Sequence, residues 1–341
     1  MKTLSDRSRR WPIVMVALAG VMAILPVTGC DDDGTGPEPL FAIETIWPHE
    51  DGDSWTFDLA LAERDWQQEP FTTPGEVPDL PAVDVLWEQF QEPLPGAASE
   101  SVTGTFRLAF DGEITTGSGV TVQHLAETLL PETERSRAAV TSGHALPGWL
   151  RTLAAARPDL RDRIARRYDL DVSALAAAKD LNLFEPIFLS GYAWQQTADG
   201  IFGYGDLSTE PSWIYLTDDL QEGASFSLQL VPGLADDVYL YGRVVFRGQK
   251  VVAGQVFLNV MQCFYVLDMG VGSLTDENGH HLGSVRMYMV GLVTYVPGLG
   301  PVRSHDRRYV MTGGIVDQTE TALVVYELKA GLSGSTVGAE R

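Results

Sequence analysis

The sequence predicts a mainly β protein of the α+β class, built on an antiparallel, curved sheet or half-barrel with an inserted module of short helices. Three observations predict this class. Apolar and polar residues alternate in several segments, as around Trp55, Phe57 and Leu59, which is the period of a half-buried strand. Short turns join the strand-like segments of the C-terminal half, without the helical crossovers that a parallel sheet needs. Between residues 119 and 182, alanine and arginine become common and strand formers thin out.

The N-terminus has the three parts of a secretory signal: a basic start, a short apolar stretch and small residues before a cleavage site. The charged residues of the first ten positions are Lys2, Asp6, Arg7, Arg9 and Arg10. The apolar run covers residues 13–25, whereas a membrane-spanning helix needs about 20 residues. Residues 1–29 are therefore predicted to be a signal peptide that does not remain as an anchor.

The four residues Val27-Thr28-Gly29-Cys30 resemble a lipobox, the processing site of bacterial lipoproteins. The resemblance implies cleavage between Gly29 and Cys30, a diacylglyceryl thioether on Cys30, and acylation of the new amino group. Two or three acyl chains hold a protein durably on a membrane, whereas one chain binds only marginally. An ordinary signal peptide with a cysteine near its cleavage site by chance is the alternative. The lipobox therefore predicts a protein of the cell envelope, outside the cytoplasm and lipid-anchored to the inner or the outer membrane.

The mature chain is expected to divide into five parts. Residues 30–40 are acidic and rich in Gly and Pro, so they cannot bury enough surface to fold and should form a flexible tether. The other four parts are an N-terminal β portion (41–118), a helical insertion (119–182), a C-terminal antiparallel β portion (183–331) and a disordered tail (332–341).

The first β portion and the insertion contain the less regular patterns. Residues 63–100 hold many Pro and Glu, so we expect them to be irregular between two strands. In the insertion, Asp159 is expected to cap a helix that places Leu160, Ile164 and Tyr168 on one face. Asp171 is expected to cap a second helix through Lys179, and the insertion should contain three or four short helices.

The C-terminal β portion has the clearest strand patterns. Gly248-Gln249 and Asn278-Gly279 are predicted turns, and the second pair is the strongest short hairpin signal. Residues 260–267 are apolar on both faces, as expected for a strand at the centre of a sheet. The five predicted strands are Val238–Phe246, Val251–Met269, Leu282–Val296, Val302–Met311 and Ala322–Leu328.

One segment of this portion resembles a family. Residues 295–302 are similar to the aromatic-x-Pro-Gly-x-Gly-x-Val segment of many uncharacterised bacterial lipoproteins, with Pro297, Gly298 and Gly300 in the matching places. Those proteins also have a Gly-x-x-Trp strand just past the tether, which Gly52 and Trp55 match. Pro297-Gly298 suits a type II turn, in which Gly supplies a positive φ. The resemblance covers the two β portions and implies a fold and a location, but no reaction.

Charge and cysteine content exclude some functions. The formal net charge is −22 and the signal contributes +3, so the mature chain is near −22 − 3 = −25. This charge opposes binding to nucleic acid, whose affinity comes mainly from neutralised phosphates. Once Cys30 is acylated, Cys263 is the remaining thiol, so no intramolecular disulfide is possible. Its apolar, strand-like neighbours predict a buried and inert side chain.

An arginine cluster is the main candidate site. Six arginines face only Asp159 and Asp162 between residues 151 and 167, a net charge of +4 in an acidic protein. The cluster could dock phosphate-bearing headgroups, polysaccharide or an acidic partner, because guanidinium groups match such oxyanions. It could equally be a solvated helix that pairs with the acidic sheet. The six residues are Arg151, Arg157, Arg161, Arg163, Arg166 and Arg167.

Other candidate sites have weaker patterns. His280 and His281, with Asp276, Glu277 and His305, could bind zinc, but adjacent strand residues point to opposite faces, so a polar turn is favoured. No metal, cofactor or catalytic residue is therefore predicted, and no serine lies in Gly-x-Ser-x-Gly. Tryptophans could line a cup for an apolar ligand or fill a core. They are Trp47, Trp55, Trp66, Trp87, Trp194 and Trp213.

Three functions follow as hypotheses. The first is a non-catalytic lipoprotein that binds an envelope protein, polysaccharide or lipid, or has a structural role. The second is a carrier that shelters a lipid or other apolar ligand, which predicts an open apolar cavity in the curved sheet. The third is an envelope hydrolase, which predicts polar side chains that converge in a cleft and have shifted pKa values.

Overall fold

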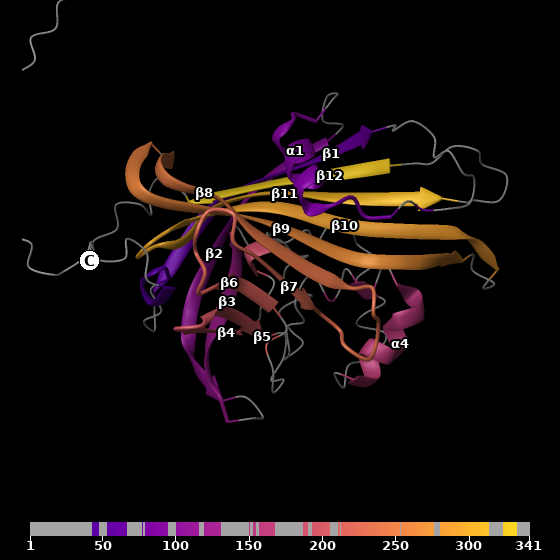
Figure 1. The fold of residues 1–341 in the computed structure, drawn as a ribbon, viewed down its shortest axis with the longest axis horizontal. Helices are drawn as coiled ribbons and strands as arrows, with labels where there is room; N and C mark the ends of the chain where they lie inside the picture. Colours follow the sequence, from indigo (N-terminus) through magenta and orange to yellow (C-terminus); the bar gives the residue numbers. More distant parts are fainter. Residues whose placement is uncertain are drawn as a thin grey trace, which may run out of the picture. The chain divides into compact units, whose positions relative to one another are not determined.

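The described part of the chain contains twelve β-strands, which form one sheet (Figure 1). This computed structural model describes residues 43–47, 53–66, 77, 79–94, 100–115, 119–130, 150, 153–154, 157–167, 187–189, 193–204, 211, 213–252, 254–275, 280–313 and 323–332. The strands are β1 (Ser54–Trp66), β2 (Glu100–Thr115), β3 (Thr121–Leu130), β4 (Ala193–Thr197), β5 (Gly200–Tyr204), β6 (Trp213–Thr217), β7 (Ser225–Gln229), β8 (Tyr239–Val252), β9 (Gln255–Thr275), β10 (His281–Val296), β11 (Gly300–Gly313) and β12 (Leu323–Leu332).

Every neighbouring pair of strands is antiparallel, in the order β6-β5-β4-β3-β2-β1-β12-β11-β10-β9-β8-β7. The first strand therefore lies beside the last, and Phe57 of β1 pairs with Leu332 of β12. β1 has the predicted alternation, because Trp55 and Phe57 are buried while Asp58 is exposed. The predicted mainly β, antiparallel fold is confirmed.

The sheet curves so strongly that its two edges approach each other. Edge strand β6 contacts β7 and β8, which lie at the opposite end of the strand order. The hydroxyl of Tyr265 on β9 donates a hydrogen bond to the carbonyl of Tyr215 on β6. We call the face that carries Tyr265 and Tyr295 the inner face, and the face that carries Phe264 and Tyr288 the outer face.

Helix α1 (Val83–Gln91) lies on the outer face, within residues 63–100 that we expected to be irregular. That expectation is wrong for this segment. Leu86 and Phe90, spaced by one helical turn, are buried and pack with Phe264 and Tyr288 of the sheet. A nine-residue helix is marginal by itself, so these apolar contacts stabilise it.

Strand β3 corrects the predicted helical insertion. Residues 121–130 pair with β2 from Thr115↔Thr121 to Thr105↔Leu130, so the expectation of helices from residue 119 is wrong. Further along, the predicted helix is present as α4 (Pro158–Arg167), with Leu160 and Ile164 buried. Tyr168 and the second predicted helix, 171–179, lie outside the described residues.

The C-terminal strands correspond to the five predicted ones, with one correction at the first turn. Gly248-Gln249 lies inside β8, where the pairing with β9 shifts register between Gly248 and Lys250, so it is a bulge and not a turn. The predicted turn Asn278-Gly279 lies outside the described residues, between the paired residues Thr275 and His281.

The described residues also include two 3₁₀ helices, η1 (Ile43–Thr45) and η2 (Ile187–Leu189). All described residues belong to one of the chain's two units, residues 39–341. Within the described residues, no helix combines the length and hydropathy that crossing a bilayer requires.

Candidate functional site

Large aromatic side chains fill the inner face of the sheet. Trp47 stacks on Trp194 with ring centroids 4.6 Å apart, and Trp55 packs edge-on against Phe110 at 5.4 Å. Trp47, Trp194 and Trp213 are fully buried. The side chains lie where the carrier hypothesis requires an open cavity, so this packing counts against that hypothesis. We call this group the aromatic core; its members are Trp47, Trp55, Phe57, Phe110, Phe188, Trp194, Trp213, Tyr215, Tyr265 and Tyr295.

The remaining tryptophans of the predicted set lie elsewhere. Trp87 is on α1, where its ring centroid is 5.2 Å from that of Phe264 on the outer face. The side chain of Trp66 lies outside the described residues. The tryptophans whose side chains are described therefore pack in cores on both faces.

Hydroxyl and thiol groups are sealed within the aromatic core. The hydroxyls of Tyr265 and Tyr295 are 2.8 Å apart and share a hydrogen bond. Burial raises the pKa of both hydroxyls well above the usual value for tyrosine. Burial also raises the pKa of the Cys263 thiol to about 12. A thiol at that pKa holds its proton at neutral pH, which agrees with the inert cysteine expected from the sequence.

Asp306 is a buried carboxylic acid on β11. Its Oδ2 accepts a hydrogen bond from the backbone N–H of Ile187 (3.0 Å), and its Oδ1 is 2.7 Å from the hydroxyl oxygen of Ser304. Burial raises the pKa of Asp306 to about 7, although these hydrogen bonds oppose the rise. Gly291 provides the space, because a Cβ there would lie 2.4 Å from Oδ1. Asp306 therefore fastens η2 to the sheet.

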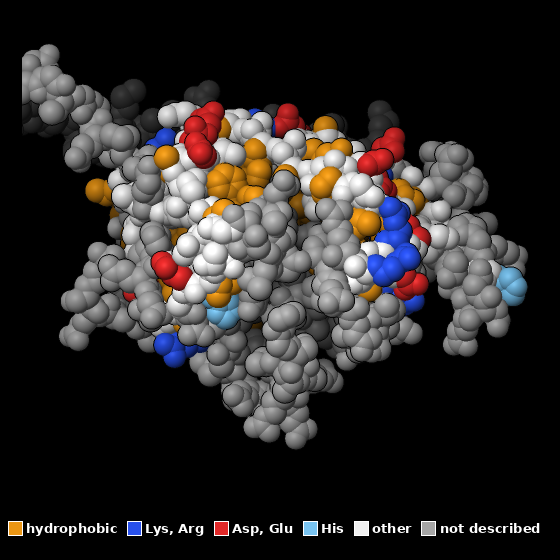
Figure 2. Space-filling view, turned by 90° about the horizontal axis from the view of Figure 1, so that it is seen from below, with side chains coloured by type: hydrophobic (Ala, Val, Ile, Leu, Met, Phe, Trp, Pro, Cys, Tyr) orange, Lys and Arg blue, Asp and Glu red, His pale blue; other side chains and the backbone are white. Residues whose placement is uncertain are grey.

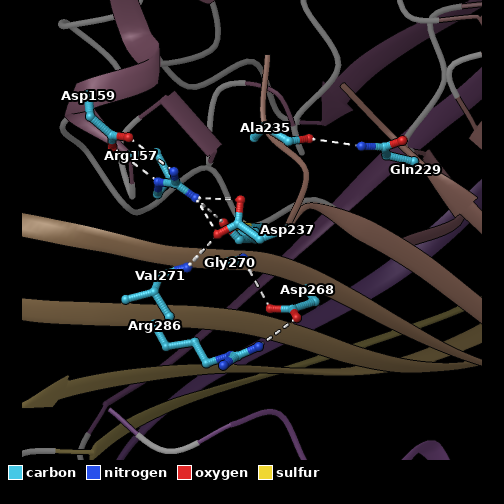
Figure 3. A network of polar contacts seen from close by, with 10 residues as sticks. Arg157, Asp159, Gln229, Ala235, Asp237, Asp268, Gly270, Val271 and Arg286 are labelled. Carbon is cyan, nitrogen blue, oxygen red and sulfur yellow. Dashed lines mark hydrogen bonds and ion pairs between the residues drawn. The ribbon is translucent and has the colours of Figure 1, made fainter. Parts of the chain in front are cut away.

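An ion network attaches α4 to the sheet (Figure 3). Arg157, just before α4, is 3.0 Å from a carboxylate oxygen of Asp159 and 3.0 Å from one of Asp237. Its Nη1 also donates to the carbonyl of Met269 on β9 (3.4 Å). Burial lowers the pKa of Arg157, but the two carboxylates outweigh it and raise the pKa overall. Asp159 thus binds Arg157 in the first turn of α4, and the expectation that it caps the helix is wrong.

Gly270 of β9 lies at the centre of this network. Its φ is +70°, and a Cβ there would lie 2.1 Å from Oδ2 of Asp237 and 2.8 Å from Nη1 of Arg157. The carboxylate of Asp268 accepts the Gly270 N–H (3.0 Å) and pairs with Nη2 of Arg286 (2.7 Å). Asp268 and Arg286 are both buried. The bulge at Gly270 therefore links the half-exposed Arg157–Asp237 pair to the buried Asp268–Arg286 pair (Figure 3).

The arginines of the predicted dock whose side chains are described lie in different surroundings. The side chain of Arg157 is only 9% exposed and is bound in the ion network, so its assignment to a dock is wrong. Arg151 and the side chain of Arg167 lie outside the described residues. Two of the others, Arg163 and Arg166, are exposed on α4.

The exposed part of α4 carries charges of both signs, because Asp159 and Asp162 are exposed beside Arg163 and Arg166. Nη2 of Arg163 donates to the carbonyl of Gly233 (3.2 Å), and Nε of Arg166 donates to the carbonyl of Asp162 (3.1 Å). Arg161 lies 3.6 Å from the carboxylate of Asp162. Lys and Arg side chains gather beside acidic ones over α4, on the right of Figure 2. We call Arg163 and Arg166, which lie three residues apart on one side of the helix, the arginine face.

The Pro297–Gly300 segment forms the turn between β10 and β11 and holds the start of the body. Gly298 and Gly300 have φ values of +78° and +76°. Their N–H groups donate to the carbonyls of Thr45 (2.8 Å) and Ile46 (2.9 Å). A Cβ on Gly300 would lie 2.5 Å from the indole of Trp47. Sequence patterns predicted this turn but not its partner, residues 43–47, which we call the N-terminal segment.

The two histidines of the possible zinc site whose side chains are described lie in different surroundings. His305 packs on Phe90 of the outer face, with ring centroids 4.9 Å apart, while His280 is exposed at the start of β10. Asp276, Glu277 and the side chain of His281 lie outside the described residues. Among the residues described, no group of three or more His, Cys, Asp or Glu is placed to hold a metal ion.

Comparison with models of known protein families and with curated protein sequences finds no match for the chain. Its function is therefore inferred from the geometry above and from the sequence signals.

Proposed function

We propose that the protein is a lipoprotein anchored outside the cytoplasm through Cys30, and that its curved sheet is a non-catalytic binding or structural body of the cell envelope. The lipobox at Val27–Cys30 and the basic and apolar signal before it support the anchor. The strong negative charge of the body opposes binding to nucleic acid, which supports a different partner.

The observation that carries the non-catalytic role is the burial of the reactive groups of the inner face. Cys263, Tyr265, Tyr295 and Asp306 are each at most 1% exposed. A general acid, general base or nucleophile must come within hydrogen-bond reach of its substrate. These four groups contact the protein interior, so their chemistry serves packing and not turnover.

The arginine face is the surface that we assign to binding. The ion network holds α4 firmly, and guanidinium groups match carboxylate, sulfate and phosphate oxygens. Arg157 contacts β9 at Met269, whereas the N-terminal segment lies near Met261, which pairs with Tyr295. The eight residue steps from Met261 to Met269 correspond to roughly 26 Å along a strand. The arginine face therefore lies toward the opposite end of β9 from the N-terminal segment, and we assign it an acidic envelope polymer or protein as its partner.

Labelling tests the anchor. Cells that express the protein with radioactive palmitate should yield labelled protein in the membrane fraction, and Cys30→Ala should remove both the label and the firm membrane association. Cys263→Ala is the matched control, because it removes the other cysteine and should keep the label. Unlabelled wild-type protein, or unchanged membrane partition of Cys30→Ala, would contradict the anchor.

Charge reversal tests the binding surface. Arg163→Glu with Arg166→Glu should lower retention on purified acidic envelope polysaccharide several-fold, and added salt should lower wild-type retention in the same direction. Arg107→Glu with Lys329→Glu makes the same charge change at exposed positions of the sheet. Equal retention of the two variants would remove the arginine face from the proposal.

A further inference from the structure

The hairpin formed by the end of β8 and the start of β9 exposes aliphatic side chains. Val251, Val256 and Leu258 are 61%, 57% and 71% exposed. Val251 pairs with Val256 across the hairpin, and Leu258 follows Val256 by two residues on the same face of the strand. The three side chains therefore form one apolar patch. We call residues 245–262 the hairpin tip.

The hairpin tip projects beyond its neighbour β10. The last pair between β9 and β10 is Met261 with Tyr295, whereas β9 begins at Gln255. The six residues 255–260 thus extend past the end of β10, which corresponds to roughly 20 Å at the rise of a strand. Figure 1 shows the hairpin reaching past the sheet at upper left.

The chain enters the sheet at this same end. The turn after Val296, the last residue of β10, binds the N-terminal segment through Gly298 and Gly300. Only residues 31–42 separate Cys30 from Ile43. Twelve extended residues span at most about 43 Å. An anchor on Cys30 therefore holds this end of the sheet within about 43 Å of the bilayer, which is close enough for the hairpin tip to reach it.

The charge of the hairpin tip differs from that of the rest of the chain. Its 18 residues include Arg247 and Lys250 but no Asp or Glu, although the chain has 46 acidic residues. Arg303 of β11 lies near enough that its charge, after burial, helps to lower the pKa of Lys250. Lys250 is half-buried, donates to Oε1 of Gln262 (2.6 Å), and lies on the opposite face of the strand from Val251. Exposed aliphatic groups in a segment without acidic residues suit the interface of a membrane with anionic lipids.

We infer that the hairpin tip contacts the bilayer to which Cys30 is attached, with Val251, Val256 and Leu258 among the headgroups. This inference rests on the proposed lipid anchor. It assigns the tip a second, non-covalent contact with the membrane. This contact orients the sheet upright and leaves the arginine face pointing away from the bilayer.

Fluorescence of the full, lipidated protein tests the contact. Leu258→Cys carries the environment-sensitive dye NBD, and the protein is reconstituted into vesicles of phosphatidylethanolamine and phosphatidylglycerol. Cys30 is acylated and Cys263 is fully buried, so the dye reports the introduced cysteine. We expect a several-fold rise in emission and strong quenching by lipids with a nitroxide high on the acyl chain. His280→Cys, exposed beyond the other end of β9, is the matched control and should show neither.

A second pair of variants tests the aliphatic patch itself. Adding Val251→Ser and Val256→Ser to the labelled protein should reduce lipid quenching at least threefold, because each serine removes apolar surface from the contact. Adding Val85→Ser instead changes an exposed valine of α1 and should leave the quenching unchanged.

The outcomes separate this inference from the proposed function. Protein that carries palmitate and stays on vesicles, but whose position 258 is not quenched by lipid, overturns the inference and leaves the anchor intact. A rise in emission with protein concentration without vesicles shows that a second copy covers the tip, which also overturns it. Protein without palmitate overturns the anchor, and with it the basis of the inference.

Discussion

The two faces of the sheet are covered by different means. On the outer face, α1 contributes Leu86 and Phe90 to an apolar cluster, and Arg307 lies 4.7 Å over the ring of Phe90. On the inner side, α4 contributes Leu160 and Ile164 but is also bound through the ion network. Both helices combine an apolar stripe with polar contacts, because α1 is also held by the Asp84–Arg243 ion pair and by a hydrogen bond from Nη2 of Arg307 to the carbonyl of Glu92 (2.9 Å). The difference is that two carboxylates bind the guanidinium at the start of α4, whereas a backbone carbonyl binds the one at the end of α1.

The buried acid of the inner face gives the largest expected effect. Because the pKa of Asp306 is raised to about 7 in the fold, the native state binds more protons than the unfolded state between about pH 4 and pH 7. The free energy of unfolding should therefore fall as pH rises through this window. Asp306→Asn is neutral at every pH and should gain about 2–4 kcal/mol relative to wild type between pH 4 and pH 8.

Urea unfolding at pH 4, 6 and 8 measures this difference. The matched control is Asp58→Asn, an exposed aspartate of β1. A pH-independent difference between wild type and Asp306→Asn would show that Asp306 does not stay protonated in the fold.

On the outer face, truncation of the main anchor of α1 should cost about 3 kcal/mol. Phe90 is 5% exposed and packs against Phe264 and Trp87, so Phe90→Ala leaves a cavity between helix and sheet. Glu88→Ala, at an exposed position of the same helix, should change the unfolding free energy by less than about 0.5 kcal/mol. A comparable loss in both variants would mean that helix formation, and not docking, is the sensitive quantity.

Substitution of Gly270, at the bulge of β9 beside the ion network, should lower the free energy of unfolding by a smaller amount. Gly270→Ala introduces a Cβ at positive φ and against Asp237, and we expect a loss of about 2–3 kcal/mol. Gly254 also has a positive φ, +81°, but has nothing within 4 Å of an added Cβ. Gly254→Ala should therefore lose only the backbone part, about 1 kcal/mol. Thermal unfolding of the two variants isolates the close contact, and equal losses would show that the contact relaxes freely.

Replacement of the planar guanidinium of Arg157 should give the smallest loss of stability. Arg157→Lys keeps the charge but cannot bind Asp159 and Asp237 with the same planar geometry. Both carboxylates are about half exposed, so water compensates them and the loss should be about 1 kcal/mol. Hydrogen exchange should then rise in α4 and not in α1. Equal protection of α4 in both proteins would assign its docking to Leu160 and Ile164 alone.

The sequence predicted those strands and helices whose pattern of apolar residues is complete within the element itself. The doubly apolar residues 260–267 of β9 are buried, as expected for a central strand. The helix at Leu160 and Ile164 is present for the same reason. α1 was missed because Ala82 offers no side-chain cap and Pro and Glu surround the segment, although Leu86 and Phe90 have helical spacing. β3 was missed because its pairing with β2 outweighs the change in composition.

The site depended on contacts between residues far apart in sequence, which no local pattern reports. The sequence placed Arg157 in a basic cluster, yet its partner Asp237 lies 80 positions away. The turn at Pro297-Gly298 was visible as a turn, but its bond to Thr45 required the folded sheet. The burial of Asp306 could not be predicted either, because its neighbours in the sequence are polar.

The pairing of β1 with β12 has a consequence for how the molecule assembles. In the order of synthesis β1 is made before the other strands, yet one of its edges stays unpaired until β12 has been made, because Phe57 pairs with Leu332. Closing so long a loop is entropically unfavourable and slows folding. Until then β1 and β11 each present a free edge that invites pairing with other chains. A chain that is cut short before β12 should therefore be prone to aggregation, even with the other eleven described strands intact.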